Sequence, residues 1–385
     1  MWLIVLGLFL FVLLIVLHEY GHFLVAKRNG VDVEEFGIGF PPKLFGKKLG
    51  KGIFEGYYTI NLLPLGGFVR LKGEEDAATE KGSFGSVGLS AKLRIMLAGV
   101  AVNLLAALVF FTIVAWVGMP QVIPNQFSVP SDSTVLRNDI FAGYVDADSP
   151  AAQAGLQVGD TIVSLNNQPI TNEASVREVA SANAGNTVPI VYERDGQTTM
   201  ATTTLLSEQQ VADSKNTDTP KGYLGVVPRK YTLIQSTWSA PIVAVGVSAQ
   251  LTHLTLKALG EALYNLVSAF FSAITGNTKE ARQEASKAGE NVSGPVGIFA
   301  ILQQGTDLGY QFILFVVAVI SLTLAIMNFL PIPALDGGRA FVMLLFKAMK
   351  KPLTPDLEAR IHGTGFAALM ILFVVITVVD IRRFY

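Results

Sequence analysis

Four stretches of the chain are almost entirely hydrophobic and long enough to cross a lipid bilayer as helices. They are Trp2–Ala26, Ile95–Gly118, Gln311–Leu330 and the shorter Thr364–Val379. A membrane-spanning helix needs about 20 mostly apolar residues, and lipid offers no water to an open backbone. The pattern therefore predicts four transmembrane helices. The first has no basic residue before its apolar run and no cleavage site after it, so we expect it to be retained rather than removed as a signal peptide.

The segment between the first two predicted spans has a pattern typical of strands. "VDVEEFGIGF" and "IFEGYYTINLLPLGGFVRLKG" are rich in Val, Ile, Phe and Tyr and are interrupted by Gly and Pro, which predicts short strands or hairpins. The second stretch is unusually apolar around Gly66 and Gly67. We expect either a hairpin that dips into the membrane surface or a small sheet that packs on the helices.

Residues 138–229 change to a polar, alternating pattern with Gly-Asp and Asn-Asn turns. This pattern predicts a folded domain with a strand at Thr161–Leu165 and a helix around Glu173–Ala182. Beyond it, residues 239–273 are apolar but carry His253, Lys257, Glu261 and Asn265 at intervals of four. One polar stripe on an apolar helix favours an interfacial helix, with a fifth span as the alternative.

Composition supports a membrane protein and restricts its chemistry. Of the 385 residues, 51% are hydrophobic and 15% charged, and the net charge of −1 gives no basis for nucleic-acid binding. Cysteine is absent, which excludes disulfides, thiolate metal ligands and cysteine nucleophiles. Any metal must be held by nitrogen and oxygen.

Basic residues near the span ends predict the orientation. Lys27 and Arg28 follow the first span, and Lys92 and Arg94 precede the second. Because positive residues collect in cytoplasmic loops, we expect the intervening loop in the cytosol and the polar domain outside. The basic loop after the third span should return to the cytosol, whereas the arginines near the C-terminus oppose the rule mildly.

The sequence "HEYGH" carries the clearest chemistry. On a helix, His18 and His22 lie one turn apart on the same side, so both imidazoles can bind one zinc ion. Glu19 can reach a water on the metal without binding the metal itself. Ionisable residues inside a membrane helix are costly, and their default interpretation is functional. A structural role in the helix bundle is the weaker alternative.

A catalytic zinc site needs a third protein ligand. Val25 and Arg28 stand where a metzincin has Gly and His, and the remaining histidines are distant. Glu34 and Glu35 are candidates by proximity. Asp336 is the better one, because "NFLPIPALDGGRAF" stops a helix with two prolines and presents this carboxylate before a Gly-Gly turn.

The motifs "HEYGH", "NFLPIPALDGG", "SGPVGI" and "PLGGFV" together resemble the site-2 protease family, most closely its bacterial RseP-like branch, over nearly the whole chain. The resemblance implies one zinc ion per chain, held by His18, His22 and Asp336, with Glu19 as general base and acid. It also implies that Asn328 contacts substrate, although Asn328 can equally form a helix–helix hydrogen bond. An edge of the hairpin near Gly66 and Gly67 can pair with an extended substrate as an added strand.

The polar domain resembles a PDZ domain in its bacterial protease form. "GYLGVV" looks like the strand and loop that hold a peptide end, which predicts a groove at Tyr223, Leu224, Gly225 and Val226. The chain has room for one such domain, whereas the best-known RseP proteins carry two. Three roles are open for this domain: a gate that selects substrates by size, a gate that recognises peptide ends, or a simple spacer.

We therefore expect a multi-pass α-helical membrane protein with four transmembrane helices, a membrane-associated cytosolic β region and an extracytoplasmic PDZ-like α+β domain. The expected segments are 1–26, 27–94, 95–118, 119–230, 231–310, 311–330, 331–363 and 364–380. The expected function is hydrolysis of peptide bonds in or near the transmembrane segments of single-span proteins, such as anti-sigma factors or signal-peptide remnants, in the bacterial cytoplasmic membrane. An intramembrane zinc transporter and an inactive PDZ-bearing scaffold are the alternatives.

Overall fold

The chain divides into two compact units, which are described separately. Unit 1 comprises residues 1–114 and 239–385, and unit 2 comprises residues 115–238. The computed structural model describes residues 2–74, 78–194, 196–215, 220–279, 283–284, 287 and 294–384. Most of the predicted connector between residues 280 and 293, including Ser293 of "SGPVGI", lies outside the described residues.

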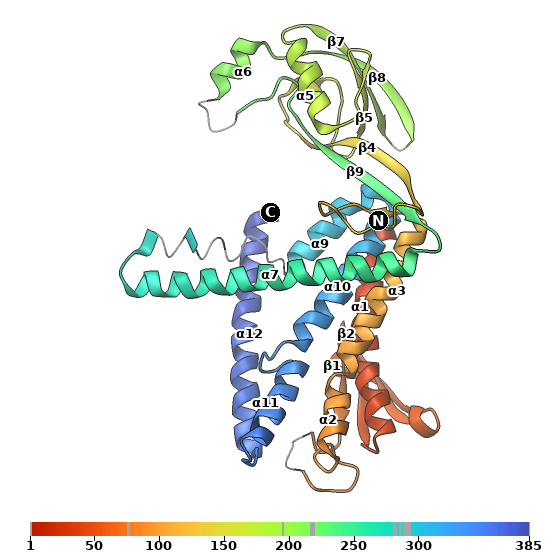
Figure 1. The fold of residues 1–385 in the computed structure, drawn as a ribbon, viewed down its shortest axis with the longest axis vertical. Coiled ribbons are helices and arrows are strands. Elements are labelled where there is room, and N and C mark those ends of the chain that lie inside the picture. The colour runs from red at the N-terminus through yellow and green to blue at the C-terminus, as the bar shows by residue number, and fades with distance from the viewer. Residues whose placement is uncertain are drawn as a thin grey trace. The chain divides into compact units, whose positions relative to one another are not determined.

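Unit 1 is built mainly of helices (Figure 1). They are α1 (Trp2–Arg28), α2 (Leu89–Met96), α3 (Ala98–Val117), α7 (Ala240–Ile274), α9 (Pro295–Gln304), α10 (Tyr310–Phe329), α11 (Asp336–Ala348) and α12 (Pro355–Phe384), with short 3₁₀ turns η1 (Gly52–Phe54) and η2 (Gly305–Leu308). Small residues bring α1 and α3 close together, because a Cβ at Gly21 would lie 2.8 Å from Val102 and 3.0 Å from the Ala98 carbonyl oxygen.

Five helical segments of the described residues, rather than four, are long and apolar enough to cross a membrane. Four correspond to the predicted spans: α1, the α2–α3 segment, α10 and α12. The fifth is α7, which was expected at the interface. Figure 1 shows α7 running across the direction of α10 and α12. Length and composition alone do not distinguish a span from an interfacial helix, so the number of four spans stays a prediction.

The cytosolic β region of the prediction is one long, irregular antiparallel hairpin of β1 (Val33–Leu49) and β2 (Gly56–Leu71). The pairing folds back on itself, since residues 36–38 pair with 67–69 on one side and with 58–60 on the other. Residues 45–49 pair in turn with 56–60. Residues 67–71 therefore form an outer edge, with no strand partner on their far side in the described part of the chain.

Part of this hairpin packs on α1, whereas other parts expose apolar side chains. Tyr20 and Phe23 of α1 pack with Phe36 and Tyr58, with ring centroids 5.5–5.8 Å apart. Large exposed residues of the hairpin include Phe40, Leu44, Phe45, Leu49 and Phe54. The hairpin thus packs on a helix, as one of the two expected arrangements requires, whereas its insertion into a membrane surface stays a prediction.

Unit 2 is an α+β domain around an antiparallel sheet in the order β3-β9-β4-β5-β7-β8, with β6 paired to β5. The strands are β3 (Met119–Pro120), β4 (Ser133–Val145), β5 (Thr161–Leu165), β6 (Gln168–Pro169), β7 (Thr187–Arg194), β8 (Gln197–Thr204) and β9 (Val226–Ser236), and the helices are α4 (Pro150–Gln153), α5 (Glu173–Ala182) and α6 (Glu208–Ser214). Ile162, Leu165 and Ile190 are fully buried in its core. The predicted strand at 161–165 and helix at 173–182 are both present.

The predicted peptide groove lies where the chain enters β9. The carbonyl oxygens of Leu224 and Gly225 accept hydrogen bonds from the N–H groups of Ala151 and Asp146. The Leu224 side chain is buried, and Gly225 has φ +73°. A Cβ at Gly225 would lie only 2.1 Å from Ser149 Cβ, so this loop is closely packed on the start of α4. Peptide binding by Tyr223, Leu224, Gly225 and Val226 stays a prediction.

Candidate metal centre

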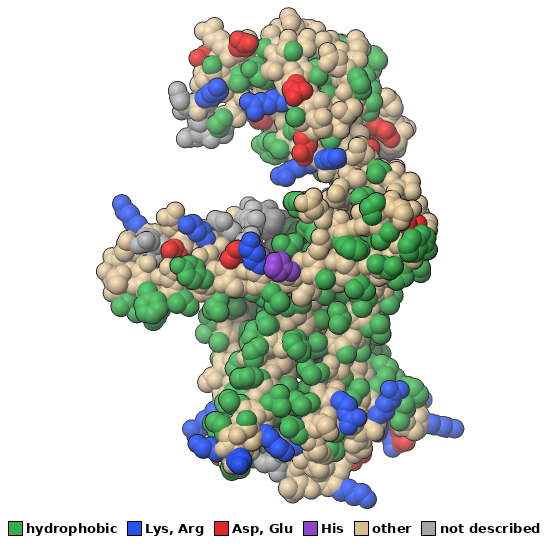
Figure 2. Space-filling model, in the orientation of Figure 1, with side chains coloured by type: hydrophobic (Ala, Val, Ile, Leu, Met, Phe, Trp, Pro, Cys, Tyr) green, Lys and Arg blue, Asp and Glu red, His purple; other side chains and the backbone are tan. Residues whose placement is uncertain are grey.

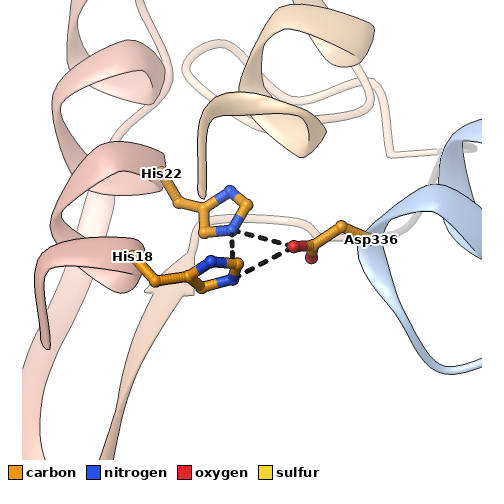
Figure 3. Close-up of side chains that lie close together, drawn as sticks. All are labelled: His18, His22 and Asp336. Carbon is orange, nitrogen blue, oxygen red and sulfur yellow. Dashed lines mark hydrogen bonds and ion pairs between the residues drawn. The ribbon is translucent and has the colours of Figure 1, made fainter. Parts of the chain in front are cut away.

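The three residues predicted as metal ligands lie together (Figure 3). His18 Nε2 and His22 Nε2 lie 3.1 and 3.3 Å from Asp336 Oδ2, and 3.2 Å from each other. Ligand atoms about 2.0–2.1 Å from one tetrahedral zinc ion would be roughly 3.3–3.4 Å apart. The three atoms therefore match one face of a zinc coordination tetrahedron.

The two histidines come from one helix and the aspartate from the start of another. His18 and His22 are buried on α1, one turn apart, and Asp336 is the first residue of α11. Glycines let α11 begin this close to the preceding loop. A Cβ at Gly337 would lie 2.3 Å from the Phe329 carbonyl oxygen, and one at Gly338 would lie 1.9 Å from that of Ile332. Larger residues would displace the aspartate.

Neighbouring groups orient both imidazoles. His22 Nδ1 lies 2.7 Å from the Ile95 carbonyl oxygen, so Nδ1 carries a proton, and in the neutral imidazole Nε2 has the free lone pair. The Asn103 amide lies 3.1 Å from His18 Nδ1, while the other end of this amide is buried with no hydrogen-bond partner among the described residues. A half-turn of the amide would place its oxygen as acceptor for an Nδ1–H of His18. In these neutral tautomers, which are the ones that can bind a metal, both Nε2 atoms face Asp336 with a lone pair.

The donor set fits a metal ion. Asp336 Oδ2 is buried, and no hydrogen bond of acceptable geometry reaches it from the described residues. Burial disfavours the charged form of this carboxyl, but the two facing imidazoles outweigh burial and lower its pKa. A single proton cannot satisfy three acceptor atoms at once, whereas a cation bound by two nitrogens and one carboxylate oxygen does, and zinc accepts this set.

Glu19 lies on the side of α1 that faces the hairpin. A Cβ at Gly67 would lie 3.6 Å from Glu19 Cγ, so strand β2 passes directly beside the predicted base. Gly66 has φ +87° and packs against the Phe40 ring, where a Cβ would be 2.8 Å away. The structure thus brings Gly67 beside Glu19, while the roles of Gly66 and Gly67 in binding substrate stay predictions.

The other candidates lie outside the ligand cluster. Asn328 is partly buried near the end of α10, and its side chain makes no hydrogen bond within the described residues. Glu35 accepts a hydrogen bond from Thr59 at 2.7 Å and pairs with Arg70 at 3.4 Å. Neither it nor Glu34 belongs to the cluster, whose members are His18, His22 and Asp336.

Two residues of the site were not identified from the sequence. Gly99 lies against the ligands, since a Cβ there would be 2.4 Å from His22 Nε2 and 2.6 Å from His18 Nε2. Asn103 is a polar residue within the otherwise apolar second predicted span. Gly99 and Asn103 are four residues apart on α3, so they occupy one face of that helix. This four-residue spacing within an apolar segment is the sequence signal that could have identified the two residues.

Known proteins are similar to this chain over nearly its whole length. The model of peptidase family M50 matches residues 6–372. A protein of Clostridium acetobutylicum named as a zinc metalloprotease is 32% identical, and the alignment covers 98% of this chain and 97% of the relative. The zinc metalloprotease RasP of Shouchella clausii is 28% identical over 98% of both chains.

A solved structure is also similar to part of the chain. It is the PDZ domain of an SdrC-like protein from Listeria monocytogenes, which is 21% identical and matches 24% of this chain and 93% of its own. The TM-score of 0.20 is too low to carry an argument about the fold of unit 2.

Gly99→Ala should abolish metal binding, because the new methyl group would occupy the space of both ligand nitrogens. The matched control is Gly88→Ala, where a Cβ would meet no atom within 4 Å. Metal content of the purified variants, measured by mass spectrometry, checks this expectation. Wild-type metal content in Gly99→Ala would contradict it.

Proposed function

The chain belongs to peptidase family M50, and from this premise we propose that His18, His22 and Asp336 hold its zinc ion while Glu19 transfers the protons of peptide-bond hydrolysis. The observation that carries the proposal is the mutual spacing of 3.1–3.3 Å among the three buried ligand atoms. As a family member with zinc metalloprotease relatives, the chain is a zinc metallopeptidase. This assignment takes precedence over the transporter and scaffold alternatives.

Each residue has a distinct part in the reaction. When bound, zinc lowers the pKa of a coordinated water to about 7 and polarises a carbonyl group. Glu19 lies outside the ligand set and beside β2, where it can accept a proton from the attacking water and deliver it to the leaving amine. Such proton transfer contributes about 10²- to 10⁴-fold to the rate. Asn103 and the Ile95 carbonyl hold the imidazoles in the tautomer that binds metal.

Glu19→Gln should retain zinc and lower cleavage of a single-span test substrate by about 10²- to 10⁴-fold. Asp336→Ala should instead lose zinc together with cleavage, because a carboxylate ligand is removed. Zinc content and substrate cleavage measured on the same detergent-purified samples separate these outcomes. Zinc content unchanged in Asp336→Ala would rule out the proposed ligand set.

We place the site at the cytosolic end of four spans in a bacterial cytoplasmic membrane, with α7 at the outer interface. In unit 1, Figure 2 shows hydrophobic side chains over the middle of the helices and Lys and Arg gathered at the end that carries α11 and the hairpin. Basic residues favour the cytoplasmic side. A reporter inserted after Arg28, and another inserted after Trp238, would test this sidedness. Each reporter should be accessible to a reagent from one side of the membrane only, the cytosolic side for Arg28 and the outer side for Trp238.

The outer edge at residues 67–71 is the proposed docking site for the substrate backbone. It lies beside Glu19 through Gly67 and lacks a strand partner on its far side in the described residues. A helical substrate must be unwound before its peptide bonds are accessible, and pairing with a strand edge would replace the lost helical hydrogen bonds. Single-span membrane proteins are the proposed substrates, and the bilayer is the medium that supplies them.

Gly67→Pro should lower kcat/KM roughly tenfold without loss of zinc, because strand alternation puts the Gly67 N–H on the same side of β2 as that of Val69, which faces Glu19. Proline removes one backbone donor, worth about 0.5–1.5 kcal/mol, and 1.4 kcal/mol corresponds to a tenfold change. Gly67→Ala is the control, because it adds a side chain but keeps the N–H. Equal kcat/KM values for the two variants would exclude strand pairing at this edge.

Unit 2 is proposed to act as a PDZ-like gate that admits substrates already shortened outside the cell. Its ends are adjacent, because Met119 pairs with Ile234 and Pro120 with Leu233. The domain can therefore be removed without stretching the chain between α3 and α7.

Replacing residues 121–232 by a two-residue Gly-Gly linker should broaden the range of membrane proteins that are cleaved, while zinc content stays at the wild-type level. Quantitative proteomics of membrane-protein fragments checks this, after the fragments that also occur with the Glu19→Gln variant are subtracted. A cleavage profile identical to wild type would indicate that the domain is only a spacer.

A further inference from the structure

The loop that delivers Asp336 to the metal site depends on a group outside itself. Between residues 330 and 335, two positions are prolines without an N–H. The N–H groups of Leu330, Ile332 and Leu335 donate to carbonyl oxygens within residues 327–332. The remaining one, that of Ala334, donates to His362 Nδ1 on α12 at 3.2 Å. Among the backbone N–H groups of this loop, that of Ala334 is thus the one that donates to another element within the described residues.

Ala334 also has an unusual backbone conformation. Its φ of +79° lies in the left-handed region, which residues other than glycine rarely adopt. Such a conformation persists only where the surroundings determine it. Ala334 lies two residues before Asp336, so a change in its backbone would shift the carboxylate directly.

Helix α12 contacts the same loop at one further point and the first turns of α11 at another. A Cβ at Gly365 would lie 2.5–2.7 Å from Pro333, which shows how closely the helix approaches. Arg339 of α11 lies 3.5 Å from the buried carboxylate of Glu358 and donates to the Glu74 carbonyl oxygen at 2.7 Å. His362 therefore lies within an extended contact between α12 and the segment that begins at the metal site.

We propose that His362 is a positioning residue for the metal centre: as a neutral imidazole it accepts the Ala334 N–H and fixes the backbone that presents Asp336. The inference rests on the proposed zinc site. His362 is not one of the three predicted metal ligands, so its effect must pass through the loop. An imidazole can accept at Nδ1 only when that nitrogen is unprotonated.

The test compares substitutions that keep or remove the acceptor. Asn places an amide oxygen at nearly the position of Nδ1, Gln places one farther out, and Ala has none. His253→Ala is the matched control, because His253 is exposed on α7, away from this loop. The measurement is the rate of zinc release to a chelator from the full-length protein in detergent, with thermal unfolding of the metal-free variants as a check on folding.

We expect His362→Ala and His362→Gln to release zinc roughly tenfold faster than wild type, at the lower end of the effects known for groups that orient metal ligands. His362→Asn should stay within about twofold of wild type, as should His253→Ala. If His362→Ala does not fold, the contrast between Asn and Gln still decides the matter.

Equal release rates for Asn and Gln variants, or for His362→Ala and His253→Ala, would overturn the inference. These results differ from a failure of the proposed function. That failure would appear as wild-type protein without zinc, or as Asp336→Ala with full zinc content.

Discussion

The structure depends on the convergence of two imidazoles and one carboxylate from distant parts of the chain. Their three ligand atoms can lie 3.1–3.3 Å apart only if α1, α3 and the start of α11 approach very closely. Glycine supplies that closeness at Gly21, Gly99, Gly337 and Gly338, where a side chain would collide with a neighbour. Membrane helices associate through small residues of this kind. The same close approach of these helices therefore determines both the packing of unit 1 and the geometry of the proposed metal site.

Helix α1 carries or contacts the residues proposed for metal binding, for proton transfer and for substrate docking. One face carries His18 and His22, and another presents Glu19 to strand β2 at Gly67. Tyr20 and Phe23 of the same helix pack on the hairpin. Two of the proposed ligands, the proposed base and the proposed substrate edge are thus held by one helix, which limits the errors in their relative positions.

Local sequence signals predicted the features that depend on nearby residues. The spacing of His18 and His22 fixed their common face, and the prolines before Asp336 marked a helix boundary that the structure contains. The predicted Gly-Gly turn was wrong, because Gly337 and Gly338 lie in the first turn of α11. The strand 161–165 and the helix 173–182 followed from the alternating pattern and its turns. In contrast, the contacts of Gly99, Asn103 and His362 are made between helices, and a single sequence does not show which faces meet. The orientation of α7 had the same difficulty, because an apolar helix with one polar stripe suits two environments.

The pairing of β3 with β9 has a consequence for how proteins of this architecture can diversify. The chain leaves the helical unit and returns to it through two neighbouring strands, Met119–Pro120 and the end of Val226–Ser236. Whatever is inserted between them begins and ends at paired, neighbouring residues. Inserted modules can therefore be lengthened, duplicated or exchanged over evolutionary time without a change in the distance that the chain must span between α3 and α7.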